Sequence, residues 1–121
     1  MLPLITPQRF FLYLPPTDMR KSFDGLCGLV SGAMARDPLS GDVYVLLNRR
    51  RDRIKLLVWQ RGGFWIFYKR LESGSFQLPP HSAQTDSLLL PYADLMLLIE
   101  GIELASVKRR KNMTFLEKVV A

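Results

Sequence analysis

Positively charged side chains are the most concentrated group of residues in this sequence that could take part in binding. Residues 48–70, NRRRDRIKLLVWQRGGFWIFYKR, contain eight Lys and Arg residues and a single acid, Asp52. Arginines crowded on one short loop repel one another, and a bound anion offsets that repulsion. We therefore expect phosphate contacts here, and we expect Asp52 to shape the turn. The expected nucleic-acid-binding residues of this segment are Arg49, Arg50, Arg51, Arg53, Lys55, Arg61, Lys69 and Arg70.

Two more cations, Arg20 and Lys21, lie in the motif TDMRK at residues 17–21. We predict that this motif forms the first turn of a helix, where backbone N–H groups attract anions. Cations at that position are unfavourable unless an anion or an acid such as Asp18 compensates them. Arg20 and Lys21 are therefore added to the expected nucleic-acid-binding residues. The run KRRK at residues 108–111 is either a solvated tail or an arm along a nucleic-acid backbone.

The acidic residues, by contrast, do not form a recognisable catalytic or metal-binding pattern. The pairs Asp18 with Asp24 and Asp37 with Asp42 could supply oxygen ligands to a divalent cation. However, Asp37 and Asp42 begin and end the turn-forming motif DPLSGD, and Asp18 fits a helix cap. The sequence has no phosphate-binding glycine loop, nucleophile elbow or metal-ligating histidine pair. We therefore predict a protein that is not an enzyme, with no catalytic residues, no metal and no cofactor.

Composition and charge fit a globular protein with an anionic partner. The 121 residues are 48% hydrophobic and carry a formal net charge of +6, from 17 basic and 11 acidic residues. That excess favours a polyanion, because Lys and Arg that neutralise phosphates release counterions. No apolar run approaches the roughly 18 residues that span a bilayer, so we expect no membrane partner. A single cysteine, Cys27, permits no internal disulfide and favours a reducing, cytoplasmic location.

Hydrophobic periodicity predicts a single globular α+β domain over residues 1–107, followed by a basic C-terminal tail at 108–121. The domain is expected to contain a four-stranded, mainly antiparallel sheet, with a main helix packed on one face and a C-terminal helix. The predicted strands are residues 10–14, 43–48, 54–59 and 64–69, the predicted helices are about 18–35 and 91–104, and 72–87 is predicted as loop. Thr17 or Asp18 is the expected N-cap of the first helix.

The predicted strands carry apolar side chains on both faces. In IKLLVW, Leu56 and Val58 point to one side of the sheet, and Leu57 and Trp59 point to the other. Such a sheet needs a covering layer on both sides or a partner. The aromatic residues between the cations fit core strands better than they fit a surface on which bases stack.

A row of glycines on the first predicted helix is open to two interpretations. Gly25, Gly28 and Gly32 lie on roughly one side of that helix, away from its apolar face. The row either admits the backbone of a partner or forms a loosely packed surface. Together with the two-sided apolar sheet, it supports the hypothesis of a protein–protein interaction module, for instance a homodimer.

Several motifs also follow one another in an order found in a known protein family. They are TDMRKSFDGL at 17–26, DPLSG at 37–41, NRRRDRIKLL at 48–57 and YKRLESGSF at 68–76. Through them, residues 9–107 resemble the small accessory protein (TnpB, Orf-two-like) of the insertion-sequence-sixty-six family of bacterial transposons. The resemblance implies a protein that is encoded beside a separate DDE-type transposase and assists transposition. It implies no catalytic residues.

The charge clustering and the resemblance lead to one principal hypothesis. We expect a non-catalytic accessory protein for DNA transposition that binds DNA through a basic hairpin rim and assists the transposase of the same element. The alternative is a protein–protein interaction module, as a homodimer or docked on the transposase, without direct DNA contact.

Overall fold

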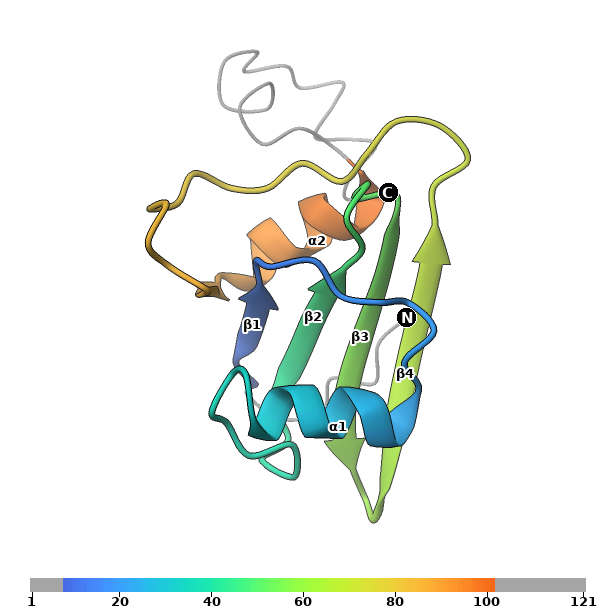
Figure 1. Cartoon of the computed structure of the whole chain (residues 1–121), viewed down its shortest axis with the longest axis vertical. Helices are drawn as coiled ribbons and strands as arrows, with labels where there is room; N and C mark the ends of the chain where they lie inside the picture. The colour runs from blue at the N-terminus through green and yellow to red at the C-terminus, as the bar shows by residue number, and fades with distance from the viewer. Residues whose placement is uncertain (1–7, 102–121) are drawn as a thin grey trace.

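In a computed structural model, residues 8–101 form a five-stranded sheet with one helix on each face (Figure 1). The strands are β1 (Phe10–Tyr13), β2 (Val43–Leu47), β3 (Arg53–Gln60), β4 (Gly63–Arg70) and β5 (Ser87–Leu90), and the helices are α1 (Phe23–Ser31) and α2 (Tyr92–Glu100). The strand order across the sheet is β4-β3-β2-β1-β5. The predicted α+β class is confirmed, but the sheet has five strands where four were predicted.

The additional strand is β5, which pairs antiparallel with β1. Leu88 lies opposite Leu12, and Leu90 lies opposite Phe10. The four residues SLLL show no alternation of apolar and polar side chains, and Pro91 follows them directly. A strand this short has no periodicity that could separate it from the start of a helix, which is why the sequence did not reveal it.

The strand directions bring two distant segments to the same end of the sheet. β1 and β2 are parallel, with Phe10 beside Val43 and Tyr13 beside Leu46, whereas the other three pairs are antiparallel. Parallel neighbours need a crossover connection, and α1 lies in it. Because β1 and β2 run in the same direction, the chain leaves both strands at the same end of the sheet.

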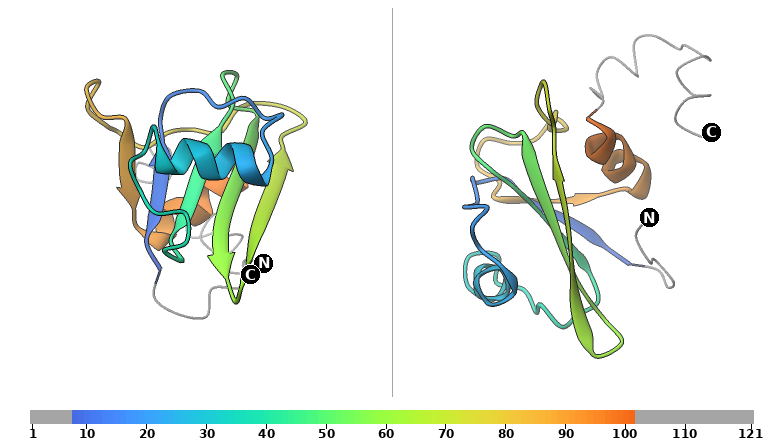
Figure 2. Two further views of the ribbon diagram at one scale, coloured as in Figure 1. Left: turned by 60° about the horizontal axis from the view of Figure 1, so that its bottom comes forward. Right: turned by 90° about the vertical axis from the view of Figure 1, so that its right-hand side faces the viewer.

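Each face of the sheet is covered by one helix (Figure 2), which is the first of the two alternatives, a covering layer or a partner, that the apolar faces left open. On one face, Leu26 and Val30 of α1 pack against Tyr44, Leu46 and Leu57 of the sheet. On the other face, α2 covers a larger core. That core includes Leu12, Val45, Ile54, Leu56, Val58, Leu95 and Leu98, all nearly inaccessible to solvent.

A tight hairpin joins β3 to β4. Gln60 pairs with Gly63, so the turn contains only Arg61 and Gly62. Their φ angles of 51° and 83° are both positive, as a type I′ turn requires. β3 has eight residues, and at about 3.3 Å per residue this turn lies roughly 25 Å from the loop that joins β2 to β3.

The first helix is shorter than predicted, because residues 18–21 form a separate turn before it. The N-cap is Ser22, not Thr17 or Asp18, and its carbonyl accepts the first helical bond from the Leu26 N–H. At the other end, the Arg36 N–H donates to the carbonyl of Val30 around Ala35, whose φ is 52°. The helix itself ends at Ser31 with Gly32 as its C-cap, and the left-handed Ala35 turns the chain just beyond it.

The C-terminal helix was predicted to extend to residue 104. α2 begins after Pro91 and is followed by Gly101, whose φ of 77° forms a left-handed cap. The predicted continuation of this helix and the basic tail at 108–121 lie outside the described residues.

Candidate nucleic-acid interface

The centre of the candidate interface is the arginine loop, residues 49–52, which joins β2 to β3. The side chain of Asn48 organises it: its Oδ1 accepts hydrogen bonds from the N–H groups of Asp52 and Arg53, each at 3.0 Å. Its Nδ2 donates to Asp52 Oδ1 at 2.6 Å. This bond from Asn48 lowers the pKa of the Asp52 carboxyl group. Asp52 therefore shapes the loop, as predicted.

Backbone contacts from the end of β4 hold the same loop on its other side. The Leu71 N–H donates to the carbonyl of Asp52 at 2.7 Å, and the Phe76 N–H donates to the carbonyl of Arg51 at 2.6 Å. Arg51 has a φ of 58°, a left-handed backbone conformation that is uncommon for any residue other than glycine. These contacts fix the loop in one conformation with its arginines directed to the surface.

The turn at residues 17–21 lies against the end of β2. The Thr17 N–H donates to the carbonyl of Leu47 at 2.7 Å. Asp18 Oδ1 accepts a hydrogen bond from the Arg20 N–H at 2.9 Å, and Asp18 Oδ2 accepts one from the Arg20 guanidinium at 2.8 Å. The side-chain hydrogen bond from Arg20 lowers the pKa of Asp18 to about 2. Asp18 is thus ionised and orients Arg20.

The arginine loop and this turn together line an open hollow of about 580 Å³. Residues 16–20 form one side, and Asn48, Arg49, Arg50 and Arg53 form the other. Four arginines and one acid line the hollow, so its charge is positive and suits a phosphate or another oxyanion. The motifs TDMRK and NRRRDR, separate in the sequence, therefore contribute to one surface.

None of the three exposed arginines of the loop forms an ion pair with an acid of residues 8–101. Within residues 8–101 there are three ion pairs, Arg9–Asp42, Arg20–Asp18 and Arg70–Glu72. Arg49, Arg50 and Arg51 are exposed and belong to none of them. Arg53 is half-buried, and its guanidinium donates to the hydroxyl of Tyr68 at 3.3 Å. The three loop arginines are thus the most available cations of this surface.

Two of the lysines predicted to bind nucleic acid have roles inside the fold instead. Lys55 is only 8% exposed, and its Nζ donates to the carbonyls of Met19 and Lys21 at 2.8 and 2.7 Å. Lys69 Nζ donates to the carbonyl of Ile99 at 2.8 Å, near the C-terminal end of α2, where a cation is favourable. We therefore leave both lysines out of the candidate interface.

The other three predicted cations, Arg70, Lys21 and Arg61, are not among the residues that line the hollow. Arg70 is paired with Glu72 at 2.9 Å. Lys21 is exposed and is the last residue of the turn, with its side chain against Gly25. Arg61 lies in the β3–β4 turn at the opposite end of the sheet (Figure 1). The predicted basic rim is therefore divided, and only its arginine-loop end meets the turn at residues 17–21.

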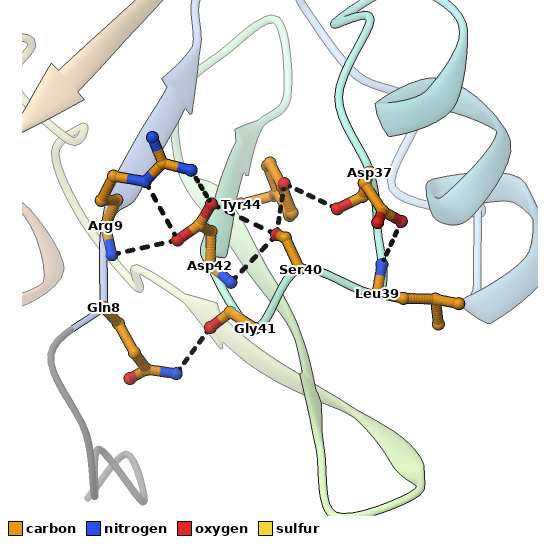
Figure 3. Close-up of polar contacts among 8 residues, drawn as sticks. All are labelled: Gln8, Arg9, Asp37, Leu39, Ser40, Gly41, Asp42 and Tyr44. Atoms are coloured by element: carbon orange, nitrogen blue, oxygen red, sulfur yellow. Dashed lines mark hydrogen bonds and ion pairs between the residues drawn. The ribbon is translucent and has the colours of Figure 1, made fainter.

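The remaining acids of interest form a structural network around the start of β2 (Figure 3). Asp42 Oδ2 accepts a hydrogen bond from the Arg9 guanidinium at 2.9 Å and another from the Ser40 hydroxyl at 3.2 Å. The Tyr44 hydroxyl donates to the carbonyl of Asp37 at 2.9 Å, and burial raises the pKa of Tyr44. The motif DPLSGD thus builds a turn, as predicted for Asp37 and Asp42, while the contribution of Arg9 carried no sequence signal.

Two further classes of site find no support in residues 8–101. No group of three or more His, Cys, Asp and Glu side chains in that range could hold a metal ion. Neither α1 nor α2 is long and apolar enough to cross a membrane. The glycine row of α1 makes no close backbone contact with another element, since a Cβ at Gly28 would meet no atom within 4 Å.

The five aromatic residues of segment 48–70 lie in β3 and β4, as predicted, but not all of them are buried. Trp59 and Phe64 meet edge to face, with their ring centroids 4.9 Å apart. Trp65 and Tyr68 on β4 are 51% and 52% exposed. Lys55 Nζ lies 4.8 Å from the centroid of the Tyr68 ring, and the Tyr68 hydroxyl accepts a hydrogen bond from Arg53, one of the residues that line the hollow.

Comparison with known proteins identifies a family and two relatives that match most of the chain. The family described as "IS66 Orf2 like protein" matches residues 8–109. The uncharacterized protein y4jC of Sinorhizobium fredii (strain NBRC 101917 / NGR234) is 33% identical over 102 residues, which cover 84% of this chain and 86% of y4jC. The uncharacterized protein y4hO of the same organism is 33% identical over 104 residues, covering 85% and 88%. No solved structure matches. The chain therefore belongs to the IS66 Orf2-like family of transposition-associated accessory proteins.

Proposed function

We propose that this protein binds the phosphate backbone of DNA through the hollow between the arginine loop and the turn at residues 17–21. The observation that carries the proposal is the meeting of these two segments around one cationic concavity. Its loop arginines take part in no ion pair within residues 8–101. In this role the protein is a non-catalytic accessory factor, and it assists a separate transposase of the same element.

The chemistry of the hollow favours contacts with phosphates over readout of bases. Arginine guanidinium groups form paired, charge-assisted hydrogen bonds with phosphate oxygens. An open hollow at the end of a sheet presents neither a helix nor a β-ribbon of a shape that enters the major groove. Contacts of this kind fix the position of the protein on the duplex without selecting a sequence. Any preference for element ends then comes from the transposase or from DNA shape.

The held conformation of the arginine loop also supports the proposal. Like charges on a mobile loop would separate, but Asn48 and the backbone contacts of Leu71 and Phe76 keep these arginines together. The left-handed conformation of Arg51 adds backbone strain of roughly 1 kcal/mol. Strain retained in this way is common at binding sites, where the surrounding structure fixes the geometry that a ligand needs.

The test is a salt-titrated binding assay with a labelled duplex from the element end. If the four arginines that line the hollow (Arg20, Arg49, Arg50 and Arg53) and the exposed Arg51 beside them each neutralise one phosphate, log K falls against log salt with a slope of about −4 to −5. The triple variant Arg49→Ala/Arg50→Ala/Arg51→Ala should reduce that slope by roughly 2.7 units and should weaken binding at low salt.

Arg61→Ala is the matched control, because it removes one exposed charge from a turn at the other end of the sheet. It should leave the slope within experimental error of the wild-type value, whereas Arg50→Ala alone should change it by about 0.9. Absence of binding at low salt, or equal slopes for the triple variant and the wild type, would refute the proposal.

A further inference from the structure

The outer edge of β4 is long, regular and unpaired within residues 8–101. All eight of its residues pair with β3 on the inner side, without a bulge or a proline. By contrast β5, at the opposite edge of the sheet, has only four residues. Exposed strand edges of soluble proteins are usually short or interrupted, because an open edge offers backbone groups to another strand. The edge of β4 therefore requires an explanation.

The backbone groups that β4 presents at this edge follow from its hydrogen bonding to β3. Gln60 and Gly63 close a two-residue hairpin, and the residues of such a closing pair exchange both backbone hydrogen bonds. Along two antiparallel strands, residue pairs that exchange backbone hydrogen bonds alternate with pairs that do not. The bond from the Leu71 N–H to the Asp52 carbonyl fits this alternation at the other end of β4. The odd-numbered residues of β4 therefore bond to β3, and the N–H groups of Phe64, Ile66 and Tyr68 point to the free edge.

The charge pattern of β4 indicates what can pair with this edge. Its first half is apolar and aromatic, GFWIF, whereas its second half ends in Lys69 and Arg70. A parallel second copy of β4 would place each cation against its own equivalent. An antiparallel copy centred on Ile66 instead places Lys69 opposite Gly63 and Trp65 opposite Phe67. The strand is thus complementary to itself in one direction only.

We propose that β4 pairs antiparallel with β4 of a second copy of this chain, joining the two sheets into one. The main-chain groups of Phe64, Ile66 and Tyr68 supply the new ladder. Trp65, which is 51% exposed and stacked on Phe67 at 5.8 Å, gains an aromatic neighbour from the second copy. Cross-strand aromatic pairs of this kind stabilise antiparallel sheets. The contact is isologous, as in most homodimers.

The pairing has a geometric consequence for the arginine loops. Antiparallel strands of one sheet are related by a twofold axis perpendicular to it, so the two α1-covered faces lie on the same side while the two arginine loops lie at opposite ends of the joined sheet. At about 3.3 Å per residue, the roughly six residues between Leu57, the partner of Ile66, and each loop place the two loops roughly 40 Å apart along the joined sheet, so one duplex would have to follow its length to meet both. This consequence rests on the proposed function, whereas the dimer itself does not depend on DNA binding.

The experiment measures the mass of the wild-type chain by light scattering over a range of concentrations. It is carried out in about 0.5 M NaCl, where attraction between charges is screened. We expect a dimer that Trp65→Lys converts to a monomer. Leu89→Lys is the matched control, since Leu89 is 61% exposed on β5, the opposite edge strand, and this variant should remain dimeric.

Amide hydrogen exchange of the wild type provides a second readout that needs no variant. In the dimer, the amides of Phe64, Ile66 and Tyr68 should be protected like those of Trp65 and Phe67. A monomer at every concentration, with fast exchange at the three even-numbered positions, would overturn the proposal. Protection of these amides in a monomer would also overturn it, because another part of the chain would then cover the edge.

Discussion

Lys55 carries a positive charge into the face of the sheet that α1 covers. Its Nζ donates to two carbonyl groups of the turn at residues 17–21 and lies over the ring of Tyr68. A buried cation without such partners would be strongly destabilising. The lysine therefore fastens the turn to β3 and fixes one wall of the hollow, without itself being available to a phosphate.

Replacing Lys55 with Met tests this role, because Met keeps most of the apolar stem and removes the ammonium group. We expect a loss of about 1–2 kcal/mol in the free energy of unfolding, measured by urea denaturation. The amides of Arg20 and Lys21 should also exchange faster in the folded protein. Arg49→Met is the matched control and should change stability by less than about 0.5 kcal/mol. Unchanged exchange at residues 20 and 21 in Lys55→Met would contradict the assigned role.

Asp18 gives the turn a defined dependence on pH. Its pKa is lowered from 3.8 to about 2, chiefly by the hydrogen bond from the Arg20 side chain. Because the folded-state pKa is depressed, the stabilisation is complete above pH 4 and is lost as the pH falls toward 2. An NMR titration of the Asp18 carboxyl carbon should therefore have its midpoint near 2. In Arg20→Ala the midpoint should rise toward about 3.9, and a wild-type midpoint near that value would show that the pair does not form.

At the scale of the elements, two turns each contain an arginine whose backbone is in the left-handed conformation. Arg51 in the arginine loop has a φ of 58°, and Arg61 in the β3–β4 hairpin has a φ of 51°. Asparagine adopts this conformation more readily, and Asn-Gly is the preferred sequence of a type I′ turn. Both arginines therefore occupy positions at which the backbone alone would favour another residue.

The variants Arg61→Asn and Arg51→Asn separate backbone preference from charge. Each should raise the free energy of unfolding by about 0.5–1 kcal/mol, because each relieves the same kind of strain. Only Arg51→Asn should weaken DNA binding, since Arg61 lies at the other end of the sheet. Thermal unfolding and a binding titration of the two variants check this. Equal loss of binding in both would mean that the interface extends along the whole of β3 and β4.

The elements differed in how well the sequence predicted them. The β3–β4 hairpin was located within one or two residues, because its strands are long and its turn contains glycines. β5 was missed, and α1 was predicted too long. Residues 18–21 have helix-like composition, but Asp18 bonds to the backbone of Arg20 and forms a turn of its own. Such local competition between side chain and backbone is not visible in hydrophobic periodicity.

At the scale of the whole molecule, the sequence indicated which residues are cationic but not which of them lie together. The parallel pairing of β1 with β2 brings residues 17–21 beside the arginine loop, whereas the length of β3 places Arg61 at the other end of the sheet. Lys55 and Lys69 looked like surface cations because their hydrogen-bond partners, the carbonyls of Met19, Lys21 and Ile99, are backbone groups. Every residue type has a backbone carbonyl, so a lysine that donates to one cannot be recognised from the type of its partner residue.

The same arrangement keeps the two proposed binding regions apart, since the described residues that line the hollow all lie outside β4. The hollow lies where β2 passes into β3, whereas the free edge of β4 lies at the side of the sheet. A dimer formed through β4 therefore leaves both hollows open to DNA.

The most direct test of the account is to titrate the ¹⁵N-labelled protein with element-end duplex at low salt and to map the changes in its NMR spectrum. The account predicts that the perturbed amide and guanidinium signals belong to residues 17–20 and 48–53, that Arg61 and Gly62 are unaffected, and that added salt reverses the changes. Perturbations centred on the Arg61 turn, or a spectrum that the duplex leaves unchanged, would contradict it.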